Sequence, residues 1–178
     1  FMRRKLFFWE LGGFLFTGAV GTLLHFVYEC SGGSLLAACV SAVNESTWEH
    51  MKLLFVPLFL FSVAQVCLLG RNYPNLLAVR ALSTLMGAAL IPVLFYTYTG
   101  ILGYHVTWVD ISIFYLADLG AFALDFALLR RGKLSARWMQ LLGLAALWGL
   151  AFCFVWCTFR PVSLPLWRDP VTGVYGIP

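Results

Sequence analysis

The chain has 178 residues, of which 61% are hydrophobic and 11% charged, and its formal net charge is +4. A soluble domain carries roughly 25% charged residues, so this composition excludes an ordinary soluble protein and indicates a membrane protein. Its basic residues lie at the ends of apolar runs, not in a patch with interleaved aromatic side chains, which excludes nucleic acid as a partner. We expect residues 1–178 to form one integral membrane domain.

Five apolar segments are long enough to cross a bilayer, which requires about 20 residues per helix. The first follows Arg3, Arg4 and Lys5 but is longer than the apolar core of a secretory signal, so we interpret it as a retained span. The sequence therefore predicts an all-α polytopic bundle with five transmembrane helices. Their approximate bounds are 6–28, 48–69, 76–102, 106–129 and 138–159.

A shorter apolar run, residues 34–43, lies between the first and second spans. It follows Ser31-Gly32-Gly33 and ends at Asn44, and it is too short to cross the membrane. This pattern predicts a re-entrant or interfacial half-helix that other parts of the protein must shield from lipid.

The positions of the basic residues predict the orientation of the bundle. Lys and Arg concentrate in cytoplasmic loops. They occur at the amino terminus and in the second and fourth loops, as Arg3, Arg4, Lys5, Arg71, Arg80, Arg130, Arg131, Lys133 and Arg137. The amino terminus is therefore predicted to be cytoplasmic and the tail, residues 160–178, extracytoplasmic, although Arg160 and Arg168 favour the opposite side. The tail either folds back over a site there or anchors at the interface.

The most polar stretch of the chain begins the second span, where Glu45, Glu49, His50 and Lys52 follow Asn44. Charged groups near hydrocarbon are expensive and occur mainly where they pair, line a wet cavity or bind a ligand. A helix cap explains an acidic residue in the first turn, and Glu49 and Lys52 have ion-pair spacing. Neither explains why Glu45, Glu49 and His50 occur together, so we interpret the stretch as a binding or catalytic site.

In this topology, polar side chains from distant segments meet on the extracytoplasmic side. The candidate ligand-binding residues are His25, Glu29, Asn44, Glu45, Glu49, His50, Lys52, His105, Asp110 and Asp118. Imidazole and carboxylate groups suit zinc or manganese, and the candidate metal ligands are His25, Glu49 and His50. No pair has the His-x-x-x-His spacing, so a transported cation or an amine-bearing ligand fits the acidic excess equally well.

The fourth span carries two aspartates, Asp118 and Asp125, on nearly the same face. Asp125 and Glu10 are expected to pair with Arg80. Asp118 has no cationic partner at its depth, so it is protonated, hydrogen-bonded to Tyr or Thr, or part of a proton or ion path. On the first span, Gly18 and Gly21 share one face with His25, which suits close helix packing or a helix that lines a site.

The five cysteines do not form the framework of a disulfide-rich protein. Cys67 is expected to pack inside a helix. The other four, Cys30, Cys39, Cys153 and Cys157, are expected to lie toward one membrane face, where two of them could form a disulfide.

Two stretches, Asn44 to Lys52 and Pro165 to Gly176, resemble a family of small uncharacterised bacterial integral membrane proteins with an Asn-Glu-Ser-x-Trp-Glu-His motif. The resemblance implies a bacterial origin and an inner-membrane location, and it implies no activity. Trp48-Glu49-His50 also resembles the polar-Trp-x-His stretch of the seven-span zinc hydrolases of the ceramidase and progestin-receptor superfamily. That superfamily needs a late His-x-x-x-His pair, and no histidine follows His105 in this chain.

Three functional hypotheses follow. The first is a protein that binds or transports a small cation or polar ligand, with the acidic residues supplying negative potential, the histidines acting as ligands and Asp118 coupling to protons. The second is an intramembrane metal-dependent hydrolase of lipid or peptide, in which Glu45 or Glu49 activates water. The third is a structural or assembly protein whose charges only pair internally. The oligomeric state stays open.

Overall fold

The computed structural model describes residues 2–178, and its regular structure is α-helical apart from one short 3-10 turn. Five of its helices are long and apolar enough to span a membrane, which confirms the predicted fold class. The elements are α1 (Met2–Cys30), α2 (Leu35–Ala38), α3 (Thr47–Leu69), α4 (Leu76–Leu102), α5 (Thr107–Leu129), α6 (Arg137–Phe159) and the 3-10 helix η1 (Pro165–Trp167).

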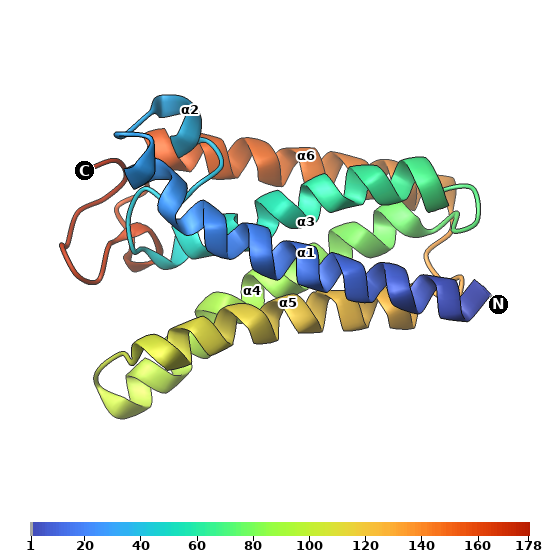
Figure 1. Ribbon diagram of the computed structural model, residues 1–178, viewed down its shortest axis with the longest axis horizontal. Helices are drawn as coiled ribbons and strands as arrows, with labels where there is room; N and C mark the ends of the chain where they lie inside the picture. Colours follow the sequence, from blue (N-terminus) through green and yellow to red (C-terminus); the bar gives the residue numbers. More distant parts are fainter. Residues whose placement is uncertain (1) are drawn as a thin grey trace.

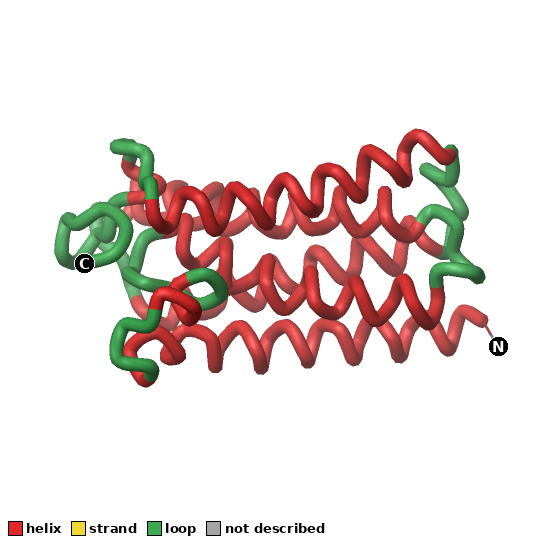
Figure 2. Tube along the Cα trace, turned by 90° about the horizontal axis from the view of Figure 1, so that it is seen from above, coloured by secondary structure: helices red, strands yellow, loops and turns green. Residues whose placement is uncertain are grey.

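The five long helices run along the long axis of the molecule, and the two termini lie at opposite ends (Figure 1). Irregular segments are confined to these two ends (Figure 2). Such confinement is what a bilayer requires, because lipid cannot satisfy exposed backbone groups. We call the end with residues 160–178 the tail end, and the end with the amino terminus and the loops 70–75 and 130–136 the basic end.

Large apolar side chains cover the outside of the bundle. Leu23 on α1 and Phe152 on α6 are 66% and 65% exposed, and many others on all five long helices resemble them. A soluble monomer rarely exposes apolar surface so continuously, and lipid is the solvent that such a surface suits.

The small-residue face of α1 allows close contact with α3 and α5. A Cβ added at Gly21 would lie 2.8 Å from the carbonyl oxygen of Leu53, and one added at Gly18 would lie 2.9 Å from the ring of Tyr115. A side chain at Gly21 would meet the backbone of α3, and one at Gly18 would displace the Tyr115 ring, so glycine permits the close approach at both positions. The packing places His25, one turn beyond Gly21, beside the beginning of α3.

The predicted half-helix is shorter than expected. Its helical part is the single turn α2, after which the chain passes through turns to Ser46. Ala37 and Ala38 are buried, and the Nζ of Lys52 donates a hydrogen bond of 2.9 Å to the carbonyl oxygen of Ala38. The segment is thus held by a buried cation of α3 instead of by further helical turns of its own.

The tail folds back onto the start of α3. The ring of Trp167 lies 4.8 Å from that of Trp48, centroid to centroid. Asn44 Nδ2 donates a hydrogen bond of 2.7 Å to the carbonyl oxygen of Gly176. The end of the chain therefore supports the loop that connects α2 to α3.

Candidate metal centre

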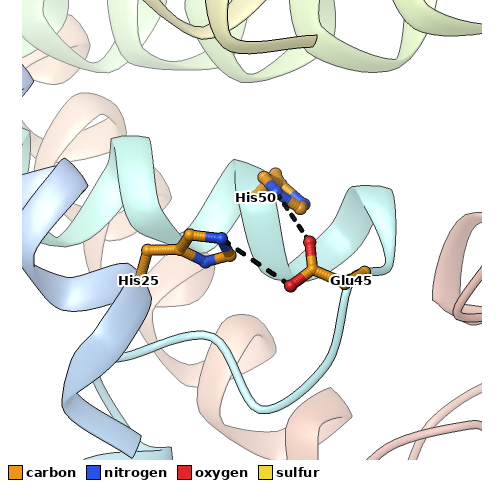
Figure 3. Close-up of side chains that lie close together, drawn as sticks. All are labelled: His25, Glu45 and His50. Atoms are coloured by element: carbon orange, nitrogen blue, oxygen red, sulfur yellow. Dashed lines mark ion pairs between the residues drawn. The ribbon is translucent and has the colours of Figure 1, made fainter. Parts of the chain in front are cut away.

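Two histidines and one glutamate from three segments meet at the tail end of the bundle (Figure 3). His25 belongs to α1, Glu45 to the loop before α3, and His50 to the first turns of α3. His25 Nε2 lies 3.6 Å from Glu45 Oε1, and His50 Nε2 lies 3.6 Å from Glu45 Oε2. One ligand atom of each residue lies within 4.8 Å of the other two. We call these three residues the His–Glu cluster.

The start of α3 explains how Glu45 and His50 come to face each other. Asn44 Oδ1 accepts a hydrogen bond of 2.9 Å from Ser46 N, and the Ser46 hydroxyl accepts one of 3.4 Å from Glu49 N. Ser46 is therefore the helix cap, with extended backbone, and the chain turns sharply at this point. The turn leaves Glu45 outside the helix, where its carboxylate faces the His50 side chain of the first helical turn.

The ring orientation of His50 is fixed by the backbone. Its Nδ1 lies 2.9 Å from the carbonyl oxygen of Ser46, which can only accept, so Nδ1 carries the proton of this hydrogen bond. In the neutral ring, Nε2 then carries a lone pair, and it is the nitrogen that faces Glu45. Metal-binding histidines are commonly oriented by such a bond from the other ring nitrogen to a backbone carbonyl.

His25, on α1, is the third member of the cluster. Its ring centroid lies 5.5 Å from that of His50, and its buried Nδ1 has no hydrogen-bond partner within the described chain. The side chains of His25, Glu45 and His50 are 31%, 48% and 31% exposed. The cluster is therefore partly open to its surroundings, so an ion can reach it from solution.

The spacing of the ligand atoms is close to what a tetrahedral cation requires. Ligands at about 2.0–2.2 Å from one tetrahedral zinc ion are separated from each other by roughly 3.3–3.6 Å. The two His–Glu separations, at 3.6 Å, are at the upper limit of this range, but they end on different oxygens of Glu45. The three ligand atoms together lie within 4.8 Å of one another, so they must move slightly closer to hold one ion. Three protein ligands leave a fourth position for water or a ligand, as in zinc sites that are not purely structural.

Glu49 lies outside this cluster. Its carboxylate is 2.5 Å from Lys52 Nζ and accepts hydrogen bonds from the Thr158 hydroxyl (2.9 Å) and from Val43 N (3.2 Å). Glu49 and Lys52 are both almost fully buried. Their pair connects α3 to α6 and to the segment after α2. Of the predicted ligand set, the structure thus brings together the two histidines, with Glu45 where Glu49 was expected.

His105 and Asp110 form a separate group at the turn between α4 and α5. His105 Nδ1 lies 3.1 Å from Asp110 Oδ2, and the Tyr98 hydroxyl donates to Asp110 Oδ1. The same hydroxyl accepts a hydrogen bond of 3.0 Å from Val106 N, so these contacts stabilise the turn. Among residues 2–178, neither His105 nor Asp110 joins the His–Glu cluster.

The remaining predicted site residues have different surroundings. The exposed Glu29 makes no described side-chain contact. Asn44 joins the loop before α3 to the tail. Asp118 is fully buried in the bundle, at the middle of α5, and is therefore distant from the turn at the start of that helix.

One contact of the His–Glu cluster with the tail was missed by sequence reasoning. Asp169 Oδ2 accepts a hydrogen bond of 3.2 Å from Glu45 N, and its Oδ1 accepts from Val171 N (2.7 Å) and Thr172 N (3.1 Å). Burial acts to raise the pKa of Asp169, but the N–H groups of Thr172, Val171 and Glu45 outweigh burial and hold the pKa below its usual range. The sequence signals a turn at Asp169-Pro170. It gives no signal that Asp169 contacts the backbone of Glu45 in a distant loop.

All five cysteines are free thiols, so the disulfide that the sequence left open does not form among residues 2–178. No cysteine contributes to the His–Glu cluster.

The five candidate spans and the apolar surface of the bundle define the class of the protein as a polytopic α-helical membrane protein. The chain belongs to the family of unknown function DUF6512, whose family model matches residues 4–177. Comparisons with curated proteins and with solved structures found no match.

Proposed function

We propose that this protein reversibly binds a divalent transition-metal cation, of which zinc is the best fit, at His25, Glu45 and His50. The observation that carries the proposal is the orientation of His50, whose Nδ1 is engaged by the Ser46 carbonyl while its Nε2 faces Glu45. Two imidazoles and one carboxylate are ligands that zinc prefers.

The exposure of the cluster favours binding and exchange over a structural metal. Structural zinc sites are closed by four protein ligands, whereas this cluster supplies three and is partly exposed. A site that keeps an open position suits capture of a cation for transport or sensing. In the hydrolase hypothesis Glu49 was a candidate base, but its carboxylate is engaged by Lys52, Thr158 and Val43.

The basic residues support an extracytoplasmic position for the cluster. The loops of the basic end carry Arg71, Arg130, Arg131 and Lys133, and α6 begins there with Arg137. By the positive-inside rule this end faces the cytoplasm, so the cluster opens on the other side of a bacterial inner membrane.

Zinc titration of the purified protein tests the proposal. The protein is stripped with a chelator in detergent, titrated with zinc by calorimetry, and assayed for bound metal after desalting. We expect one zinc per chain in the native protein and its loss in His50→Ala. The matched control is His105→Ala, which removes an imidazole from a group outside the cluster and should leave zinc binding unchanged.

Two results would overturn the proposal. One is equal zinc binding by the native protein and His50→Ala. The other is a zinc-dependent cleavage of lipid or peptide that is lost in His50→Ala, which would identify a metal-dependent hydrolase instead of a binding protein.

A further inference from the structure

Asp118 is an isolated carboxyl group in the middle of the bundle. It lies midway between the ends of α5, Thr107 and Leu129, and its exposure is 0%. Neither of its carboxyl oxygens has a hydrogen-bond partner within the described chain. The other buried carboxylates of the bundle, Glu10, Glu49 and Asp125, all contact a cation.

The surrounding charges do not neutralise an ionised Asp118. The charged groups that face the interior near it are Glu10 from α1, Arg80 from α4 and Asp125 from α5 itself. Arg80 is already engaged by Glu10 at 3.5 Å and by Asp125. From α3, the buried Gln65 is neutral, and Lys52 is paired with Glu49. In this part of the described bundle, one arginine therefore faces three carboxyl groups.

Two unusual threonines lie on the helices packed around this part of α5. Thr17 precedes Gly18, where an added Cβ would lie 3.6 Å from Asp118 Oδ2. Thr84 lies one turn before Gly87, which packs against Ala117 and Ala121 on either side of Asp118. Both threonines are buried, and neither hydroxyl has a partner within the described chain.

These free hydroxyls depart from the pattern of the other helical Ser and Thr side chains. Seven helical hydroxyls donate to the backbone carbonyl four residues earlier, which is the usual local solution for Ser and Thr in a helix. They belong to Thr22, Ser62, Ser83, Thr97, Thr99, Ser112 and Thr158. Thr17 and Thr84 thus keep their hydrogen-bonding capacity in the same region as the unpartnered carboxyl group.

We propose that Asp118 is a proton-binding site in the middle of the membrane domain, with Thr17 and Thr84 as the polar groups beside it. An ionised carboxylate without a partner costs several kcal/mol in a dry interior, and one bound proton removes its charge. A sodium ion would need several oxygen ligands besides the carboxyl group, whereas a proton needs none, and neither carboxyl oxygen has a hydrogen-bond partner within the described chain. The inference does not depend on metal binding at the His–Glu cluster, since the two sites share no residue.

Infrared spectroscopy of the protein at neutral pH tests this site. An exposed aspartate is ionised at this pH, so a carboxylic-acid carbonyl band reports a buried protonated group. We expect a component of this band in the native protein that disappears in Asp118→Asn and is retained in Asp110→Asn, where the lost carboxyl group is outside the dry interior. Absence of a component that depends on Asp118 would overturn the proposal. So would displacement of that component by sodium, which would identify a sodium site.

Thermal unfolding gives a second, independent readout. Asparagine has nearly the shape of a protonated aspartate, so Asp118→Asn should change the melting temperature little. Asp125→Asn removes a partner of Arg80 and should lower it clearly. If Asp118→Asn unfolds at the same lowered temperature as Asp125→Asn, Asp118 is an ionised structural group and the proposal fails.

Discussion

The His–Glu cluster and the charges inside the bundle use similar groups in opposite ways. In the interior, Arg80 contacts Glu10, Gln65 and Asp125, and none of these side chains is more than 5% exposed. In the cluster, the side chains are about one-third to one-half exposed, and Glu45 is separated from each histidine by 3.6 Å. The interior charges are dry and in direct contact, whereas the groups of the cluster are more exposed and farther apart.

The interior network is built from four helices. Glu10 comes from α1, Gln65 from α3 and Asp125 from α5, and all converge on Arg80 of α4. The Arg80 guanidinium also lies 4.9 Å from the centre of the Phe122 ring, and Ser83 donates a hydrogen bond of 2.7 Å to Asp125. Such a network fixes which helices are neighbours, and its partners depend on one another.

The largest effect is expected from Arg80→Met. The substitution leaves Glu10 and Asp125 buried without a cation, and breaking a buried pair in this way costs roughly 3–5 kcal/mol. The free energy of unfolding in detergent, measured with a chemical denaturant, should fall by about this amount. Arg71→Met, in an exposed loop of the basic end, is the control and should have little effect. Equal stability of the two variants would show that the interior charges do not hold the bundle.

The second largest effect is expected from Lys52→Met. It leaves Glu49 buried without its cation and removes the donor to the carbonyl oxygen of Ala38. We expect a loss of about 3 kcal/mol in the free energy of unfolding, and partial recovery when Glu49→Gln is added, because the double variant buries no charge. A double variant less stable than Lys52→Met alone would contradict this account of the pair.

A smaller effect on stability, but a large one on metal binding, is expected from His25→Ala. The side chain is partly exposed and makes no interhelical contact that resembles the Arg80 network. The free energy of unfolding without metal should change by less than about 1 kcal/mol, which is usual for substitutions away from the core. Zinc affinity, measured by calorimetry, should fall on the order of 100-fold, since one of three protein ligands is lost. A large fall in stability with unchanged zinc affinity would reverse the contrast between the two regions.

A weaker effect on metal binding is expected from Asp169→Asn. This carboxylate holds Glu45 N, so its loss should loosen Glu45 and weaken zinc binding by about tenfold, as for groups that orient metal ligands. Because the pKa of Asp169 is lowered in the folded protein, its contribution to stability is present above the pKa of an unfolded aspartate. That contribution is lost as the pH falls through the lowered value.

The pH dependence of the stability of the tail provides a control for the role of Asp169. The protection of the backbone amides in residues 160–178 against hydrogen exchange, corrected for the intrinsic pH dependence of exchange, should fall when the native protein is acidified through this range. This protection should depend less on pH in Asp169→Asn. Identical pH profiles for the two proteins would contradict the assigned role.

The smallest effect is expected from Glu29→Gln. Glu29 is exposed and makes no described side-chain contact, so stability should change by no more than about 0.5 kcal/mol. Zinc affinity should also stay the same. A clear loss of zinc binding would show that the site extends along α1 beyond His25.

The helices were predictable because apolar length and flanking basic residues are local signals. The bounds of the second to fifth spans, such as 76–102 and 138–159, differ from α3 to α6 by at most one residue. The half-helix was expected over 34–43, but only α2 is helical, and Lys52 from α3 donates a hydrogen bond to the carbonyl oxygen of Ala38 at its end. That contact joins distant parts of the chain and leaves no local pattern.

The sequence predicted both histidines of the cluster and included Glu45 among the candidate ligand-binding residues, but it named Glu49 and not Glu45 as the carboxylate of the metal set. Glu45 and Glu49 stand on opposite sides of the Ser46 cap, and composition does not distinguish the loop residue from the helical one. Glu49 has Lys52 at ion-pair spacing, which correctly indicated a structural partner. Only the three-dimensional path of α1 shows that His25 faces Glu45, and only the fold of the tail shows that Asp169 holds the backbone of Glu45.

X-ray absorption at the zinc edge, recorded on protein loaded with one equivalent of zinc, tests the metal site most directly. We predict two imidazole nitrogens at about 2.0–2.1 Å and a carboxylate oxygen at about 2.0–2.2 Å, with one imidazole lost in His50→Ala. A sulfur ligand at about 2.3 Å, or a shell of water oxygens that His50→Ala leaves unchanged, would contradict binding at His25, Glu45 and His50.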